Sequence, residues 1–210
     1  KYYSELTFHY WFWKNLLAKK NNNLWIGFCQ KRRFWLQSKN SSNNLLSKVP
    51  SNWKNYNAVI CKKINLGKPK LSKLFKRGWK NIIQKPSILY SDRNYNIELH
   101  FDLFHGFRNL QKAAELVKKE DRDEFIEYIK KNRSFNPHIM CVAKPKILKL
   151  WFEDLFPWLK RCESIFGFKD LKGYDTTRLY AYLAERYHSF WFQKYSNYVE
   201  WPYKFIDTEK

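Results

Sequence analysis

The sequence is poor in the features that define secreted, disulfide-stabilised and membrane-spanning proteins. Its four cysteines form no C-x-x-C pair, and three of them lie within apolar runs, as buried free thiols do. No stretch approaches the roughly 18 uninterrupted apolar residues of a membrane span, and no signal-peptide pattern is present. We therefore expect a cytoplasmic protein with free thiols, either soluble or peripheral to a membrane.

Acidic residues are also scarce. Nineteen Asp and Glu stand against forty Lys and Arg, which gives a formal net charge of +21. A protein with this positive charge attracts polyanions, acidic membrane surfaces or phosphorylated small molecules, and the charge alone does not distinguish among them. Because 44% of the residues are hydrophobic and 20% are aromatic, the chain has ample material for a packed core. With 210 residues, no internal repeat and no long linker, it is expected to form one domain over residues 1–210.

The spacing of apolar residues predicts an α/β protein with many helices. A helix is predicted over 4–19, with Ser4 as its N-cap and an apolar stripe of Leu6, Tyr10, Trp13 and Leu17. Further helices are predicted over 107–119, 121–132, 146–164 and 176–194, the third with an apolar stripe from Leu148 to Cys162. Short strands are predicted over 24–29, 58–61 and 139–143. Pro157 is expected to bend or divide its helix. The Lys-rich stretch 62–80 has no clean period and is expected to be surface.

Several motifs resemble one known family. The segment Tyr3–Trp35 reads YSELTFHYWFWKN and then LWIGFCQKRRFW, which resembles the opening half of the capsular and exopolysaccharide glycosyltransferases described as domain of unknown function 4422. Later landmarks of that family follow in the right order: Tyr95, His105-Gly106, Asn109-Leu110, Pro137-His138, Met140-Cys141, Arg178 and Leu183-Ala184-Glu185-Arg186. This sequence differs from the family pattern at Gln30-Lys31, where the family commonly has His-Tyr, and at Ile139, where it usually has Asn.

The resemblance implies a helix-rich, GT-A-like (Rossmann-like) α/β fold whose usual first N-terminal strand is missing from this sequence. It also implies transfer of a sugar from a nucleoside-diphosphate donor, UDP-linked, to a surface or capsular polysaccharide. The acceptor would be a glycan, lipid-linked at the inner face of the membrane. The Lys-rich stretch 62–80 could then contact anionic lipid, or it could simply be solvated.

The basic cluster after the strand 24–29 is the first candidate for donor binding. At this place related transferases usually present an Asp-x-Asp pair that holds a divalent metal, whereas this chain has Gln30, Lys31, Arg32 and Arg33. These residues do not ligate a metal, but they can neutralise phosphate oxygens directly. We expect no metal or other cofactor, although a divalent ion is not excluded; H-x-D-x-x-H at 100–105 has no settled metal geometry. A solvated basic loop is the alternative.

The first helix offers a second group of donor-binding candidates, Ser4, Glu5 and Lys14. By analogy with related transferases this helix faces the donor sugar or its nucleotide. Alternatively, Ser4 and Glu5 only cap the helix, because Ser before an acidic first turn is ordinary helix chemistry.

Glu185 and His105 are the catalytic candidates. An inverting transfer needs a carboxylate to accept the proton of the acceptor hydroxyl, and Glu185 lies on a predicted polar helix face. Arg178 and Arg186 would position it or hold phosphate. The alternative is an ion-pair network within the helix that faces water. His105 could bind phosphate, orient the acceptor or relay a proton, or could be a structural histidine.

Two other functions remain open. A basic, aromatic-rich chain could be a nucleic-acid-binding module. However, its aromatic residues follow the period of helix cores, and no RRM, KH, zinc or helix-turn-helix signature is present. The missing first strand also allows an inactive, truncated transferase fragment.

Overall fold

The computed structural model describes residues 1–91 and 94–207. Its centre is a mixed four-stranded sheet in the order β1-β6-β3-β7, in which β3 pairs in parallel with β7 and the other neighbours are antiparallel. The strands are short: β1 is Ile26–Gly27, β3 is Ala58–Cys61, β6 is Cys141–Ala143 and β7 is Tyr198–Trp201. The predicted strands at 24–29, 58–61 and 139–143 are therefore confirmed, the first and last with shorter bounds.

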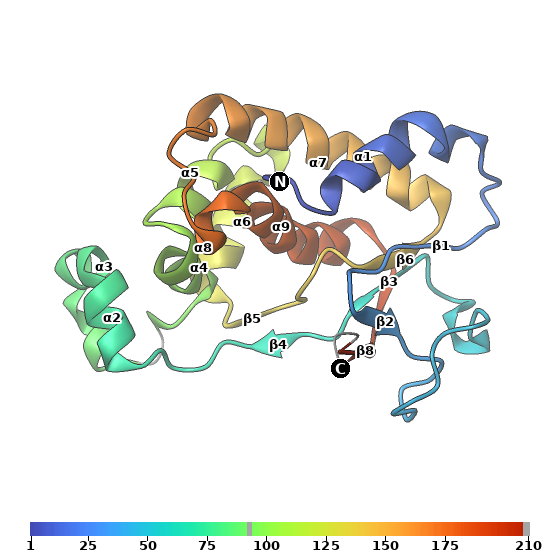
Figure 1. Cartoon of the computed structure of the whole chain (residues 1–210), viewed down its shortest axis with the longest axis horizontal. Coiled ribbons are helices and arrows are strands. Elements are labelled where there is room, and N and C mark those ends of the chain that lie inside the picture. The colour runs from blue at the N-terminus through green and yellow to red at the C-terminus, as the bar shows by residue number, and fades with distance from the viewer. Residues whose placement is uncertain (92–93, 208–210) are drawn as a thin grey trace.

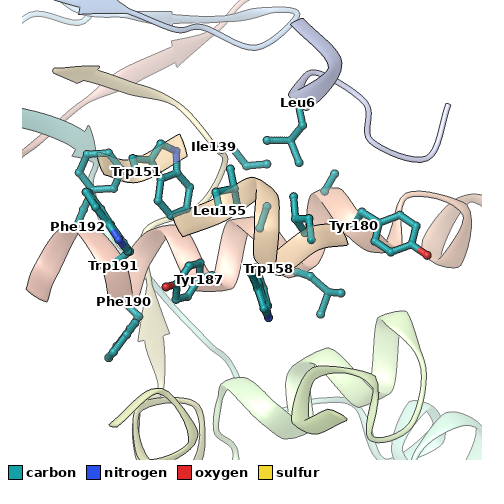
Figure 2. Close-up of a cluster of buried hydrophobic side chains, with 14 of the residues drawn as sticks. Leu6, Ile139, Trp151, Leu155, Trp158, Tyr180, Tyr187, Phe190, Trp191 and Phe192 are labelled. Atoms are coloured by element: carbon teal, nitrogen blue, oxygen red, sulfur yellow. The ribbon is translucent and has the colours of Figure 1, made fainter. Parts of the chain in front are cut away.

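Two long helices, α7 (Pro145–Phe166) and α9 (Leu179–Tyr195), hold the main core between them, and α1 (Leu6–Asn15) lies along α7 (Figure 1). Aromatic side chains fill the contact, including Trp151, Trp158, Tyr187 and Trp191 (Figure 2). The apolar stripe of α7 predicted from helical spacing is buried throughout, from Leu148 to Cys162. The stripe is buried because removing its apolar side chains from water is favourable, whereas the polar side chains on the other face stay solvated.

Shorter elements surround this centre. The remaining helices are α2 (Leu71–Arg77), α3 (Trp79–Gln84), α4 (Ile97–His105), α5 (Asn109–Ala114), α6 (Lys119–Lys131) and α8 (Tyr174–Thr177). Two small antiparallel pairs complete the fold: β2 (Arg33–Trp35) with β8 (Tyr203–Phe205), and β4 (Ile64–Asn65) with β5 (Ser134–Phe135). Among the described helices none is long and apolar enough to cross a membrane.

The predicted first helix is shorter than expected. It ends at Asn15, and residues 17–19 form a separate 3-10 turn. Ser4 is not the N-cap, because Glu5 occupies that position without a side-chain cap and Ser4 has a left-handed backbone with φ 50°. Tyr10 is exposed, whereas the helix buries His9 and Phe12 in addition to Leu6.

Pro157 lies inside α7 without dividing it. The stretch 62–80 is mostly exposed, as predicted, but it also contains β4, α2 and the start of α3, and Leu74 is fully buried. The helix α4 was not predicted at all, although Asn96 caps it by accepting a hydrogen bond from the Leu99 amide at 2.9 Å.

Candidate functional site

A cavity of about 240 Å³ brings together residues that lie far apart in the sequence. Its walls come from the start of α1, the turn into β2, the segment before β6, and the helices α8 and α9. The polar lining residues are Glu5, Gln30, Arg33, His138, Tyr174, Arg178, Tyr182 and Glu185. Four of the ten residues predicted for the site therefore line one cavity: Glu5, Arg33, Arg178 and Glu185.

Glu5 and Arg178 form one polar cluster of this cavity. Arg178 Nη2 donates a 3.2 Å hydrogen bond to Glu5 Oε2, and the same nitrogen donates to the Ser4 hydroxyl. The side-chain amide of Gln30 donates to the other oxygen of Glu5. The side chains of Ser4 and Glu5 are therefore directed at Arg178 and do not cap α1, which corrects the capping alternative.

Glu185 is the second carboxylate of the cavity. Its Oε1 accepts a hydrogen bond from the backbone amide of His138 at 2.5 Å, and its Oε2 is ion-paired with Arg186. Burial opposes ionisation of this carboxyl, but the Arg186 guanidinium and the His138 amide outweigh it and hold the pKa of Glu185 below its usual value. Glu185 is thus a carboxylate at neutral pH. It lines the cavity and is little exposed to water, although its ion pair with Arg186 lies within the helix as the alternative predicted.

Arg186 lies behind Glu185 and does not line the cavity. Its side chain is only 2% exposed, and the guanidinium stacks 3.8 Å above the centre of the Phe135 ring. A buried cation in this place fixes its partner carboxylate, because separating the pair would leave an uncompensated charge.

His105 contacts the site through one intermediate residue. Its ring stacks on that of Tyr182, with 3.8 Å between the ring centres, and its Nδ1 lies 2.8 Å from the Asp175 carbonyl oxygen. Burial lowers the pKa of His105 to about 4, so the ring is neutral at physiological pH. His105 does not line the cavity itself.

The basic cluster after β1 is divided by the fold. Arg33 lines the cavity and, among the residues that the structure describes, has no carboxylate within ion-pair distance. The Arg32 guanidinium lies 3.7 Å from Asp207, and Lys31 is exposed in the turn. Lys14 lies elsewhere, above the Trp13 ring at 3.6 Å, on a larger and mostly apolar cavity of about 540 Å³ between α1 and α7.

Three of the four described non-glycine residues with a left-handed backbone lie in the lining of the smaller cavity or directly beside a lining residue. Ser4, Arg32 and His138 have φ values of 50°, 64° and 67°. Such conformations cost of order 1–3 kcal/mol for a non-glycine residue and persist where the surrounding structure imposes them, frequently at functional sites. At His138 this conformation accompanies the amide contact with Glu185.

Four polar lining residues were not among the predicted site residues: Gln30, His138, Tyr174 and Tyr182. His138 belongs to the Pro137-His138 landmark, and Tyr182 lies one helical turn before Glu185, so both could have been found from the sequence. Tyr174 belongs to a helix of four residues with no sequence signal. Across residues 1–91 and 94–207, no group of three or more His, Cys, Asp or Glu side chains is placed to hold a metal ion.

Comparison with known proteins gives a family and a fold. The model of the family described as "Domain of unknown function (DUF4422)" matches residues 1–197. The apo structure of WbbM, described as a bifunctional glycosyltransferase, superposes with a TM-score of 0.66 at 17% sequence identity. The match covers 99% of this chain but only 37% of WbbM. No curated protein matches the sequence.

Proposed function

The chain belongs to the DUF4422 family, and from this premise we propose that it is a glycosyltransferase with a GT-A-like fold. It would move a sugar from a nucleoside-diphosphate donor, UDP-linked, to a surface or capsular polysaccharide acceptor. The shared fold with part of a bifunctional glycosyltransferase supports glycosyl transfer in general. Donor and acceptor are inferred from the chemistry of the cavity and from the sequence resemblance.

One observation carries the proposal: two carboxylates and two guanidinium groups line the same small cavity. Glycosyl transfer needs both kinds of group, because the acceptor hydroxyl loses a proton while negative charge builds on the departing diphosphate. Arg33 is the stronger candidate for a phosphate contact, since no described carboxylate neutralises it. Arg178 already neutralises Glu5 and can offer its remaining N–H groups.

In the proposed reaction Glu185 accepts the proton of the acceptor hydroxyl. The acceptor oxygen then forms a bond with the anomeric carbon, and the bond from that carbon to the diphosphate oxygen breaks. Arg33 and Arg178 hold the departing diphosphate by charge-assisted hydrogen bonds. Arg186 keeps Glu185 oriented, and His105 fixes Tyr182 against the cavity.

We further propose that the donor is held without a metal ion. Gln30 and Arg33, from the turn after β1 and the start of β2, line the cavity, and in this part of the sequence related transferases usually carry an Asp-x-Asp pair. Direct contact between guanidinium and phosphate would take over the role of that metal. Lys31, exposed on the same turn, would add to the positive field near the cavity, whereas Asp207 partly offsets the charge of Arg32.

Calorimetric titration with UDP and with UDP-sugars tests the proposal. Saturable binding is expected, and Arg33→Ala should weaken it about tenfold to hundredfold, the usual effect of losing a hydrogen bond to a charged group. Arg122→Ala is the matched control, because it removes an exposed guanidinium on α6 that lines no part of the cavity. Its affinity should equal that of the unaltered protein.

Two outcomes would overturn the proposal. Salt-sensitive binding to DNA or RNA without nucleotide selectivity would instead support a nucleic-acid-binding module. Binding of neither nucleotide nor nucleic acid would support an inactive transferase fragment.

A further inference from the structure

The helices α2 and α3 carry apolar side chains on their outer face that the fold does not bury. These side chains occur at every fourth position, and each is more than half exposed: Leu71 (54%), Phe75 (58%), Trp79 (52%) and Ile83 (69%). The two helices lie together at one end of the molecule (Figure 1). Four large apolar side chains left exposed on two adjacent short helices are typical of an interaction surface.

The inner face of the same helices explains how they are attached. Leu74 is fully buried against α4, and Asn81 donates a hydrogen bond to Asp102 at 2.6 Å. At Gly78, where α2 ends and α3 begins, an added Cβ would lie 2.8 Å from the backbone oxygen of Leu74 and 2.7 Å from Leu103 Cδ2, so this junction against α4 leaves no room for a side chain. Packing on α4 therefore uses one side of the pair and leaves the outer apolar side without a structural role.

The two helices are also basic. Residues 71–84, which span α2 and α3, contain four Lys or Arg and no Asp or Glu. Lys76 and Lys80 are exposed beside the apolar positions, and Lys80 Nζ lies 5.5 Å from the centre of the Trp79 ring. Helices that combine Trp, Phe and aliphatic side chains with lysines bind at the interface of anionic membranes.

This surface adjoins the candidate active site. Arg77 of α2 forms a 3.0 Å ion pair with Asp175 of α8. Trp79 and Lys80 share a groove of about 560 Å³ with Tyr174, which also lines the smaller cavity described above. A membrane bound to α2 and α3 would therefore lie beside the proposed site of transfer.

We propose that the outer face of α2 and α3 docks the protein on an anionic lipid bilayer. A bilayer is favoured over nucleic acid because Leu71 and Ile83 would have no partner on a phosphate backbone, whereas the acyl region of lipid accepts them. The inferred purpose of docking rests on the proposed function: docking would bring the cavity to a lipid-linked acceptor. Binding to lipid itself requires neither donor nor acceptor.

Sedimentation with vesicles tests the proposal on the whole chain. The protein should bind vesicles of phosphatidylglycerol and phosphatidylcholine, and bind vesicles of phosphatidylcholine alone much more weakly. Lys76→Gln with Lys80→Gln should lower partitioning roughly 30-fold at low salt, whereas Lys119→Gln with Lys130→Gln, two exposed lysines of α6, should leave it within about threefold.

A second pair of variants tests the apolar contribution. Phe75→Ser with Trp79→Ser should abolish sedimentation with anionic vesicles. The matched control is Phe8→Ser with Trp11→Ser, which removes two exposed aromatic rings from α1 and should retain binding. Circular dichroism should show all these variants folded, because none of the four aromatic side chains is buried.

Three results would overturn the docking surface. The first is that the unaltered protein does not bind anionic vesicles. The second is that Phe8→Ser with Trp11→Ser abolishes binding while Phe75→Ser with Trp79→Ser retains it. The third is that the protein forms an oligomer that Phe75→Ser with Trp79→Ser converts to a monomer. The UDP titration is independent of this test. Normal nucleotide affinity in a variant that no longer binds vesicles would leave the proposed function intact.

Discussion

The backbone amide of His138 donates a 2.5 Å hydrogen bond to the carboxylate of Glu185, although the two residues are 47 positions apart. His138 adopts a left-handed conformation at this contact. Arg186 occupies the other oxygen of the same carboxylate. Each carboxylate oxygen has two acceptor positions, so one on each remains for a ligand in the cavity. Glu185 is thereby fixed in orientation and held ionised.

Glu185→Gln should lower turnover by at least about a hundredfold, because an amide cannot accept the proton of the acceptor hydroxyl. The donor affinity should change by no more than about threefold, since Gln keeps the shape of the side chain. Steady-state kinetics with separate kcat and KM values for the donor check this. Near-normal turnover would remove Glu185 from the role of base.

The Glu185→Gln variant also removes the charged partner of the buried Arg186, so its effect on stability must be measured separately. Losing its partner leaves a buried guanidinium unpaired, so Glu185→Gln should also lower the free energy of unfolding, by up to about 3–5 kcal/mol. Urea denaturation measures this loss, and turnover is then compared under conditions where both proteins are folded. Glu163→Gln, which alters a carboxylate outside the smaller cavity, should leave turnover unchanged.

Transfer activity should survive a strong chelator. The basic turn after β1 places Arg33, and no acidic pair, at the cavity, so charge neutralisation of the diphosphate is assigned to the protein. The measurement is turnover before and after exhaustive treatment with EDTA. Complete loss of activity that is restored by Mn²⁺ would contradict the metal-free proposal.

The protein should unfold in mild acid because burial depresses the pKa of every histidine. The values fall to about 4 or about 3 in the folded chain for His9, His100, His105, His138 and His188. The unfolded chain binds these protons below about pH 6.5, so stability is full above that pH and decreases as the pH falls towards the folded-state values. With five such histidines, the free energy of unfolding falls by up to about 7 kcal/mol for each pH unit.

Tryptophan fluorescence between pH 7 and pH 4 follows this transition, which is expected near pH 5 for a typical stability of roughly 5–15 kcal/mol. His188→Leu supplies the internal test, because His188 is fully buried and neither ring nitrogen has a hydrogen-bond partner among the described residues. This variant should reduce the pH dependence by about one fifth, since one of five groups is removed. An unchanged transition would show that His188 titrates normally.

Pro157→Ala should stabilise the protein by about 2 kcal/mol. Proline inside a helix removes a backbone hydrogen bond and costs about 3 kcal/mol, of which about 1 kcal/mol is offset by the lower entropy of the unfolded chain. Pro157 is exposed on α7, so alanine opens no buried cavity. Urea denaturation measures the change, and a lower free energy of unfolding in the variant would contradict it.

Local patterns were sufficient for the elements whose burial has one clear period. The stripe of α7 and the fully apolar strand Ala58–Cys61 were both predicted, because a single buried face repeats at the spacing of the helix or covers every position of the strand. The pattern failed at α2, where Leu74 points inward and Phe75 points outward. A helix with apolar residues on two faces has no clean period, so its sequence resembles an irregular surface segment.

The sequence by itself determined which residue types were available: few carboxylates, many cations, and the candidates Glu5, Arg33, Arg178 and Glu185. Only the tertiary structure decided which of them meet. Glu5 and Arg178 are 173 positions apart, and Arg32 and Arg33 are neighbours with different surroundings. These side chains meet only because α1, β2 and α9 pack together. That packing depends on how the whole core is buried, and the local spacing of residues does not predict it.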